Sequence, residues 1–339
     1  MTRNQQFLLG ALAGTTATLV AARAMRSRHA IEFSGRVVVI TGGSRGLGLV
    51  MARRLAAEGA KLCLLARDPA ELDRAKAQLP ADAEVLTLRC DVRRRADVRA
   101  AMAMVLEKWA AVDVLINNAG VIQVGPLEHM NHEDFENAMA THFWGPLHLM
   151  YEVLPGMRRR GFGRIVNISS IGGKIAVPHL APYCASKFAL VGLSDSVRAE
   201  LAQHGIRVTT VCPGLMRTGS PWNADMKGRH EQEYAWFAIA DSMPGLSTSA
   251  ERAARQILEA CRFGDPELVL TLPAQAAVTA NNVMPSVVAT ITALVNRMLP
   301  SPTGPEGDRH RRGRELNTGD IPAFATALTD RAAVANNEV

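Results

Sequence analysis

Paired cysteines, metal-ligand clusters and aromatic residues are all scarce in this sequence. The five cysteines are odd in number, widely spaced and without a CxxC pair, which argues against a disulfide framework and against a zinc site. The nine histidines include His129 and His132, but no ligand set at metal spacing surrounds them. Aromatic residues make up 5% of the chain and form no combined pattern with basic residues, so we expect no nucleic-acid partner. These absences fit a protein of a reducing compartment.

The composition is otherwise that of an ordinary globular protein. Of the 339 residues, 48% are hydrophobic and 21% are charged, which allows a sizeable core in one large domain or two small ones. The net charge is +6, and much of the excess lies in two clusters that we expect to be solvated tails, with a membrane-surface or nucleic-acid role as the alternative. The clusters are Arg23, Arg26 and Arg28, and Arg309, Arg311, Arg312 and Arg314.

The N-terminal segment, residues 1–30, is a candidate membrane anchor. Residues 7–22 are uncharged and mostly apolar, but they are fewer than the roughly 20 residues that a spanning helix needs. Snorkelling of Arg23 would extend the segment to residue 25. A disordered or packing helix and an export signal are the two alternatives. The basic cluster after the segment favours a cytoplasmic position for the domain that follows, whether or not it is membrane-associated.

From Ser34 to Leu272, short apolar strands alternate with helical stretches. This rhythm predicts a parallel sheet covered by helices on both faces, a Rossmann-type doubly wound α/β domain that binds ligands at the carboxyl ends of its strands. The predicted strands are Arg36–Thr41, Lys61–Ala66, Glu84–Arg89, Val114–Asn117, Arg164–Ser169, Arg207–Cys212 and Leu268–Leu272. The predicted helices are Leu47–Glu58, Pro69–Gln78, Arg94–Trp109, His132–Met157, Ala181–His204 and Ser249–Cys261.

Three segments depart from this rhythm. Residues 219–246 carry several large apolar side chains directly after a strand, so we expect a lid over an apolar substrate, with an irregular insertion as the alternative. Residues 273–299 are apolar, rich in Ala and Val, and predicted to be a helical extension that packs on the domain, on a partner or on a membrane. From residue 300 to 339, Pro, Gly, Asn and charged residues dominate, which predicts a mostly disordered tail.

A glycine-rich turn connects the first predicted strand to the first predicted helix. Glycines in this place allow the backbone to approach a pyrophosphate, which then binds at the helix N-terminus. Because the turn has a strand before it and a helix after it, the pattern is a strong indication of dinucleotide binding. The turn consists of Thr41, Gly42, Gly43, Ser44, Arg45, Gly46, Leu47 and Gly48.

The end of the second strand favours NADP over NAD. An NAD site places an acidic residue there to bind the ribose 2′-hydroxyl, but this chain has Ala66 followed by Arg67. Arg67 together with Arg45 would suit a 2′-phosphate through bidentate hydrogen bonds. Asp68 is the alternative, because a small shift would bring its carboxylate to the ribose of NAD.

Tyr183 and Lys187 are one helical turn apart in a predicted helix, so their side chains lie on one face. A neighbouring ammonium favours the phenolate and lowers the pKa of the phenol. A tyrosine of this kind can act as the general acid that protonates an alkoxide. Alone, a Tyr-x-x-x-Lys pattern is weak, and its value depends on the rest of the chain.

With the glycine-rich turn, the chain resembles the short-chain dehydrogenase/reductase family from residue 34 to 272. The resemblance implies that Asp91 and Val92 hold the adenine and that Lys187 also binds the nicotinamide ribose. Ser170 would bind the substrate oxygen, with Ser169 as the alternative. Asn118, Ala119 and Gly120 would line the cofactor, as would Pro213, Gly214 and Thr218. The matching motifs are Thr41-Gly42-x-x-x-Gly46-x-Gly48, Asp91-Val92, Asn117-Asn118-Ala119-Gly120, Ser169-Ser170, Tyr183-x-x-x-Lys187 and Pro213-Gly214 with Thr218.

The resemblance also implies an activity, the reversible reduction of a carbonyl to a secondary alcohol, with an apolar lipid-, steroid- or acyl-like substrate suggested by the lid. Homo-oligomers are expected. One position departs from the family, because His142 stands where an asparagine usually takes part in a proton relay to Lys187. If the relay uses the backbone carbonyl, His142 keeps it. If the relay needs the side chain, the alternative is a nucleotide-binding scaffold or sensor with little catalysis.

Overall fold

The computed structural model describes residues 26–316 and 322–338. The apolar segment at residues 7–25, and with it the choice between anchor, helix and export signal, lies outside the described residues. None of the described helices is both long and apolar enough to cross a bilayer.

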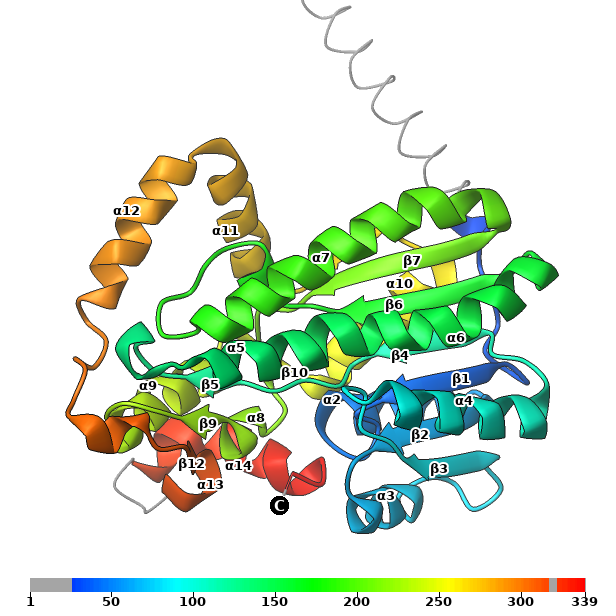
Figure 1. The fold of residues 1–339 in the computed structure, drawn as a ribbon, viewed down its shortest axis with the longest axis horizontal. Helices are drawn as coiled ribbons and strands as arrows, with labels where there is room; N and C mark the ends of the chain where they lie inside the picture. The colour runs from blue at the N-terminus through cyan, green and yellow to red at the C-terminus, as the bar shows by residue number, and fades with distance from the viewer. Residues whose placement is uncertain (1–25, 317–321, 339) are drawn as a thin grey trace, which may run out of the picture.

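A seven-stranded sheet forms the centre of the molecule (Figure 1). Its strand order is β11-β7-β6-β4-β1-β2-β3, and every neighbouring pair is parallel. The predicted doubly wound fold is thereby confirmed. The strands are β1 (Val37–Thr41), β2 (Lys61–Ala66), β3 (Val85–Arg89), β4 (Val114–Asn117), β6 (Gly163–Ile168), β7 (Ile206–Cys212) and β11 (Glu267–Val269).

Strand β1 illustrates why the apolar runs form this sheet. All of its residues are buried, and they face two different cores in alternation. Val38 and Ile40 belong to a core shared with helices α2 (Gly46–Ala57) and α10 (Ala250–Phe263). Val37 and Val39 belong to the opposite core, which the sheet shares with α4 (Arg95–Trp109) and α6 (Gly145–Arg160). A strand that is buried on both faces needs apolar residues at every position, not at every second one.

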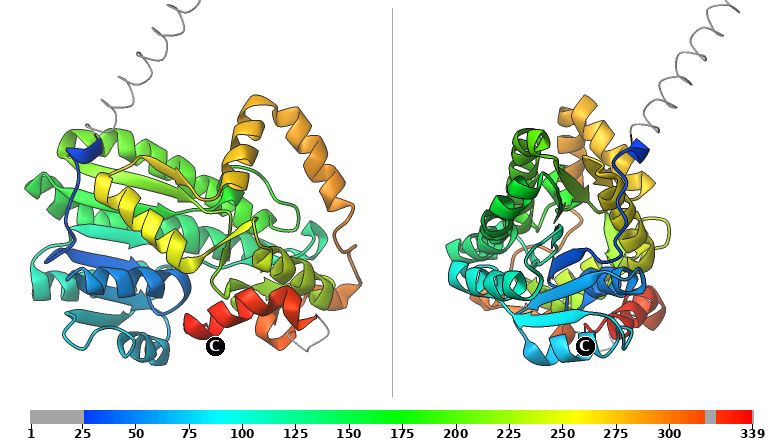
Figure 2. Two further views of the ribbon diagram at one scale, coloured as in Figure 1. Left: turned by 180° about the vertical axis from the view of Figure 1, so that it is seen from behind. Right: turned by 90° about the vertical axis from the view of Figure 1, so that its right-hand side faces the viewer.

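The helices cover both faces of the sheet (Figure 2). The long helix predicted from His132 is divided in the structure by a π-helical turn, Ala140–Trp144, which carries His142. Such turns are rare and occur often at functional sites. The remaining helices of the domain are α3 (Pro69–Lys76), α4 (Arg95–Trp109), α5 (His132–Met139), α6 (Gly145–Arg160) and α7 (Ala181–Leu201).

Residues 219–246 fold over the carboxyl ends of the strands. They form α8 (Ser220–Asn223), β9 (Asp225–Met226) and α9 (His230–Ser242). Tyr234 and Phe237 of α9 are buried in a separate apolar cluster. Strand β9 pairs with β5 (Gln123–Val124) and β12 (Arg311–Arg312), while β8 (Leu215–Arg217) pairs with β10 (Ser247–Ser249).

The extension after the last strand of the central sheet is helical, and regular structure continues beyond residue 300, where the sequence predicted disorder. Helices α11 (Leu272–Val283) and α12 (Pro285–Asn296) project from the body (Figure 1). Residues 300–339, expected to be mostly disordered, instead contain the short turn Pro305–Asp308, β12, α13 (Gly313–Leu316) and α14 (Ala323–Ala335). Polar side chains of this segment bind groups on the domain. The Asp330 carboxylate of α14, for example, accepts a hydrogen bond from the Trp222 indole at 2.9 Å.

Candidate active site

A cleft of about 1210 Å³ lies at the carboxyl ends of the strands, beside the point between β1 and β4 where the strand order reverses. The structure brings almost all of the predicted site residues to this one cavity. Those that line it are Gly42, Ser44, Arg45, Gly46, Leu47, Arg67, Asp91, Val92, Asn118, Ala119, Gly120, His142, Ser170, Tyr183, Lys187, Gly214 and Thr218. Three predicted residues, Thr41, Gly48 and Pro213, do not line it.

The glycine-rich turn has the geometry of a phosphate loop. Gly42 and Gly46 have φ angles of +61° and +54°, a region that favours glycine. A Cβ on Gly48 would lie 2.1 Å from the Gly42 carbonyl oxygen, so only glycine allows this close packing of helix on strand. Thr41 connects the turn to the segment after β4, because its Oγ1 accepts hydrogen bonds from the backbone N–H groups of Asn118 and Ala119 at 2.9 and 3.0 Å. The backbone of this glycine-rich turn has the shape that fits a dinucleotide.

Of the two adjacent serines after β6, Ser170 faces the tyrosine. The Ser170 hydroxyl lies near enough to the Tyr183 phenol to lower its pKa, whereas Ser169 donates to the Lys187 carbonyl at 3.0 Å. Burial raises the pKa of Tyr183 to about 12, and the nearby Ser170 hydroxyl offsets part of this shift. The direction is opposite to the lowering expected from Lys187.

Lys187 is buried on α7 behind the tyrosine. Its Nζ donates to the Ile168 carbonyl at 2.9 Å and lies 5.5 Å from the centre of the Tyr183 ring. Burial lowers the pKa of Lys187 to about 7, because a low-dielectric environment disfavours the ammonium. The protonation of this group is therefore easily altered near neutral pH.

His142 is enclosed completely and both of its ring nitrogens have partners. Its Nε2 accepts from the Val121 N–H at 3.1 Å, which leaves the proton on Nδ1, 2.7 Å from the Ser186 hydroxyl. Ser186 in turn donates to the Tyr183 carbonyl at 2.8 Å. Burial and the charge of Lys187 hold the pKa of His142 well below its usual range, so the ring is neutral. His142 thus connects the loop after β4 to the helix of the tyrosine.

At the opposite end of the cleft, the two predicted guanidinium groups differ in their partners. Arg45 already binds Glu71 at 3.1 Å and Glu338 at 3.3 Å. Arg67 has no hydrogen bond or ion pair among residues 26–316 and 322–338, and burial lowers its pKa. Asp68 caps α3, with its Oδ1 accepting from the Ala70 N–H at 2.8 Å, and it also lines the cleft.

Sequence reasoning missed several residues of this end. Arg312 and Arg314 line the cleft, although the C-terminal arginines were expected to be a solvated tail. Asn223 binds Arg45 at 3.0 Å, and Glu338 lines the same wall. The basic cluster itself was a signal for Arg312 and Arg314, but nothing in the composition of the tail indicated that Glu338 would return to the phosphate loop.

The wall of the cleft near the tyrosine is apolar. It is formed by Val177 and Leu180 from the loop before α7 and by Trp236 and Phe237 from α9. The loop and the helix are connected, because His179 lies 2.9 Å from the buried Glu233 carboxylate. A substrate that reaches Tyr183 would therefore contact mostly carbon.

Comparisons with known proteins agree with this geometry. The chain matches the family model described as short chain dehydrogenase over residues 36–227. Dehydrogenase/reductase SDR family member 7B from Bos taurus is 34% identical over 244 residues, covering 70% of this chain and 74% of the relative. 2-(R)-hydroxypropyl-CoM dehydrogenase from Xanthobacter autotrophicus is 38% identical, covering 59% of this chain and 82% of the relative.

Solved structures show the same architecture. A short-chain dehydrogenase from Streptomyces avermitilis superimposes with a TM-score of 0.68 at 29% identity, covering 79% of this chain and 99% of that one. L-sorbose reductase from Gluconobacter frateurii, complexed with NADPH and L-sorbose, has a TM-score of 0.64 at 26% identity, covering 71% and 97%.

Proposed function

Because the chain belongs to the short-chain dehydrogenase/reductase family, and is therefore a carbonyl/alcohol oxidoreductase that acts on a small molecule, we propose that it uses NADP and that its substrate is apolar. The observation that carries the proposal is the convergence of Ser170, Tyr183 and Lys187 in one cleft with the glycine-rich loop.

The residues of the cleft would hold the dinucleotide from end to end. The loop from Gly42 to Leu47 would receive the phosphates at the N-terminus of α2. Asn118 and Ala119 would lie beside it after β4, and Gly214 and Thr218 after β7. When bound, the nicotinamide supplies or accepts the hydride.

Ser170 and Tyr183 would position the substrate oxygen and supply its proton. Ser170 would orient the substrate oxygen, and the Tyr183 hydroxyl would protonate it as the charge develops. Burial raises the pKa of the Tyr183 phenol to about 12, and such a phenol is a poor proton donor near neutral pH. A positive Lys187 beside it would stabilise the phenolate that remains after the proton leaves.

The preference for NADP is supported by the arginines at the far end of the cleft. Arg67 is without a hydrogen-bond partner in the described structure, and Arg93 and Arg312 lie near enough to it to influence its pKa. Asp68, the residue that would favour NAD, is engaged as a helix cap. A 2′-phosphate would satisfy Arg67 through charge-assisted hydrogen bonds.

The proposal of an apolar substrate rests on the wall formed by Val177, Leu180, Trp236 and Phe237. A lipid-, steroid- or acyl-like carbonyl compound would bury apolar surface there while its oxygen reaches Ser170. The scaffold without catalysis receives no support from His142, which is neutral and hydrogen-bonded and leaves Tyr183 and Lys187 within one site.

The test is the Tyr183→Phe variant, which removes only the phenolic oxygen. Turnover of a panel of apolar ketones with NADPH should fall by roughly a thousandfold, while NADPH still binds. Tyr151→Phe, at an exposed tyrosine of α6, is the matched control and should leave turnover unchanged. Equal turnover of Tyr183→Phe and the parent chain would exclude the mechanism.

A further inference from the structure

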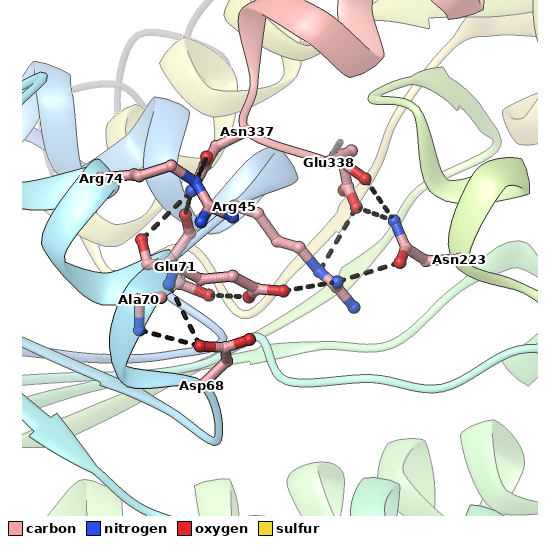
Figure 3. A network of polar contacts seen from close by, with 9 residues as sticks. Arg45, Asp68, Ala70, Glu71, Arg74, Asn223, Asn337 and Glu338 are labelled. Carbon is pink, nitrogen blue, oxygen red and sulfur yellow. Dashed lines mark hydrogen bonds and ion pairs between the residues drawn. The ribbon is translucent and has the colours of Figure 1, made fainter. Parts of the chain in front are cut away.

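The last described residues of the chain turn back onto the glycine-rich loop (Figure 3). Helix α14 brings them there, and it is held on the domain by buried contacts. The Thr329 hydroxyl lies 2.7 Å from that of Ser242 on α9, and Ala333 is fully buried, against Gly219. The tail is therefore attached to the domain before it reaches the loop.

Backbone groups of the loop are occupied by this tail. The N–H of Gly46, the first residue of α2, donates to the Asn336 carbonyl at 2.8 Å. The Asn337 side chain donates to the carbonyl oxygens of Ser44 at 2.8 Å and Glu71 at 3.1 Å. An N–H at the start of a helix that follows a glycine-rich turn is the group that such a turn offers to a phosphate.

The Glu338 side chain completes this arrangement with a carboxyl group. Its carboxylate accepts from Asn223 at 2.7 Å, lies 3.3 Å from Nε of Arg45 and is 7% exposed. It also covers the open face of Gly46, because a Cβ on that glycine would lie 2.5 Å from Glu338 Oε1. A dinucleotide loop keeps this glycine bare so that the pyrophosphate can approach it.

We propose that residues Asn336–Glu338 are an internal occupant of the phosphate subsite, in which the Glu338 carboxyl group takes the place of a cofactor phosphate and must leave before the dinucleotide binds. The proposal rests on the proposed use of this cleft for NADP. The tail and the cofactor compete for the same two features of the loop, the Gly46 N–H and the Arg45 guanidinium. Only molecules with a released tail can bind the cofactor. The apparent dissociation constant is therefore the intrinsic one divided by the fraction of molecules in which the tail is released.

The first experiment measures the dissociation constant of NADPH by its fluorescence. The forms compared are the full chain, a chain ending after Ala335, and the Asn337→Ala and Glu338→Ala variants. If the tail is docked in about nine of ten molecules, the shortened chain should bind NADPH about tenfold more tightly. The two point variants should bind it several-fold more tightly, because each loses only part of the tail's contacts. Glu107→Ala, at an exposed carboxylate of α4, is the control and should not change the affinity.

Two outcomes of this experiment overturn the proposal. Unchanged affinity in the shortened chain and in both point variants shows that the tail does not compete with the cofactor. Weaker binding shows that the tail is part of the cofactor site. If no form of the protein binds NADPH or NADH, both the proposed function and the proposed competition by the tail are wrong. If all forms bind the cofactor equally, only the proposed competition by the tail is wrong.

A second experiment detects release of the tail in the full chain. All five native cysteines are buried, so an Asn336→Cys variant places one reactive thiol in the tail. Its labelling by a maleimide should be slow in the free protein, because this position is buried, and should become at least several-fold faster at saturating NADPH. Labelling that slows or stays constant with NADPH overturns the proposal, since the tail would then remain on the loop with the cofactor bound.

Discussion

At the end of the cleft that holds Tyr183 and Lys187, the polar groups come from the loop after β6 and from α7, which follow one another in the chain. At the glycine-rich loop they come from opposite ends of the chain, and Asn337 binds the carbonyl of Ser44 across 293 positions. The first end is built from elements that the central sheet fixes in place. The second depends on a helix, α14, that is attached to the surface of the domain. We therefore expect the first end to be rigid and the second to change with ligand and pH.

The largest expected effect is at the rigid end. In Lys187→Met, a side chain of similar length loses the ammonium that lies 5.5 Å from the Tyr183 ring. With no cation beside it, a phenol whose pKa burial raises to about 12 holds its proton too tightly, so turnover should fall by roughly a hundredfold to a thousandfold. Single-turnover kinetics with NADPH measure this loss. Lys76→Met, at an exposed lysine of α3, is the control, and turnover like that of the control would remove Lys187 from the mechanism.

The next effect tests cofactor choice at the other end. Arg67→Ala removes the guanidinium that lacks a partner in the described structure, so NADPH binding should weaken by roughly tenfold to a hundredfold while NADH binding stays the same. Titration of both cofactors against Arg67→Ala and against Arg94→Ala, an exposed arginine at the N-cap of α4, measures the ratio. An equal loss for NADPH and NADH would mean that Arg67 does not recognise the 2′-phosphate.

These two ends also differ in how far the sequence predicts them. The strands, the glycine loop and the Tyr183–Lys187 pair are encoded by local patterns: apolar runs, a turn between strand and helix, and a spacing of four. Strands β2 and β4 were predicted with their observed bounds, whereas the preference for Ser170 over Ser169 as the residue that binds the substrate oxygen stays a prediction.

The tail could not be predicted in the same way. Its composition is that of a disordered segment, because its order comes from partners far away in the sequence and not from its own residues. Glu338 is one acidic residue among many until Arg45 and Asn223 are placed beside it. The division of the long helix at His142 was also missed, because a π-helical turn has no simple sequence pattern.

A smaller effect should appear as a pH dependence of NADP binding. Burial raises the pKa of Glu338 from 4.5 to about 7 in the docked tail, although Arg45 lowers it in part. Because the docked carboxyl holds its proton more tightly than the released one, protonation favours docking. As the pH rises from 4.5 to about 7, the docked state loses stability, and above about 7 the change is complete. Cofactor binding should therefore tighten over this window.

The matched variant for this prediction is Glu338→Gln, which stays uncharged at every pH. The ratio of its NADP dissociation constant to that of the parent chain should be near one at low pH and rise by roughly threefold to tenfold toward pH 8. The ratio cancels titration of the 2′-phosphate and of Asp241, whose pKa burial raises to about 7 and which contacts Thr329 of α14. Glu71 and Arg45 also face Glu338 and are the same in both proteins. A ratio that does not change with pH would contradict the prediction.

The smallest expected effect is at His142, and it tests whether this residue supports the rigid end or moves protons. In His142→Asn, a side-chain oxygen can still accept the Val121 N–H, so we expect a loss of about 1–2 kcal/mol in the free energy of unfolding and a change in turnover below about threefold. His142→Leu leaves that buried N–H without an acceptor and should cost about 1–3 kcal/mol more. Thermal unfolding and kcat of the two variants separate the roles. Because the ring is neutral and both of its nitrogens are hydrogen-bonded, we expect kcat to fall only where the variant is also less stable. A large fall in kcat for a well-folded His142→Asn protein would instead show that the imidazole itself passes protons to Lys187.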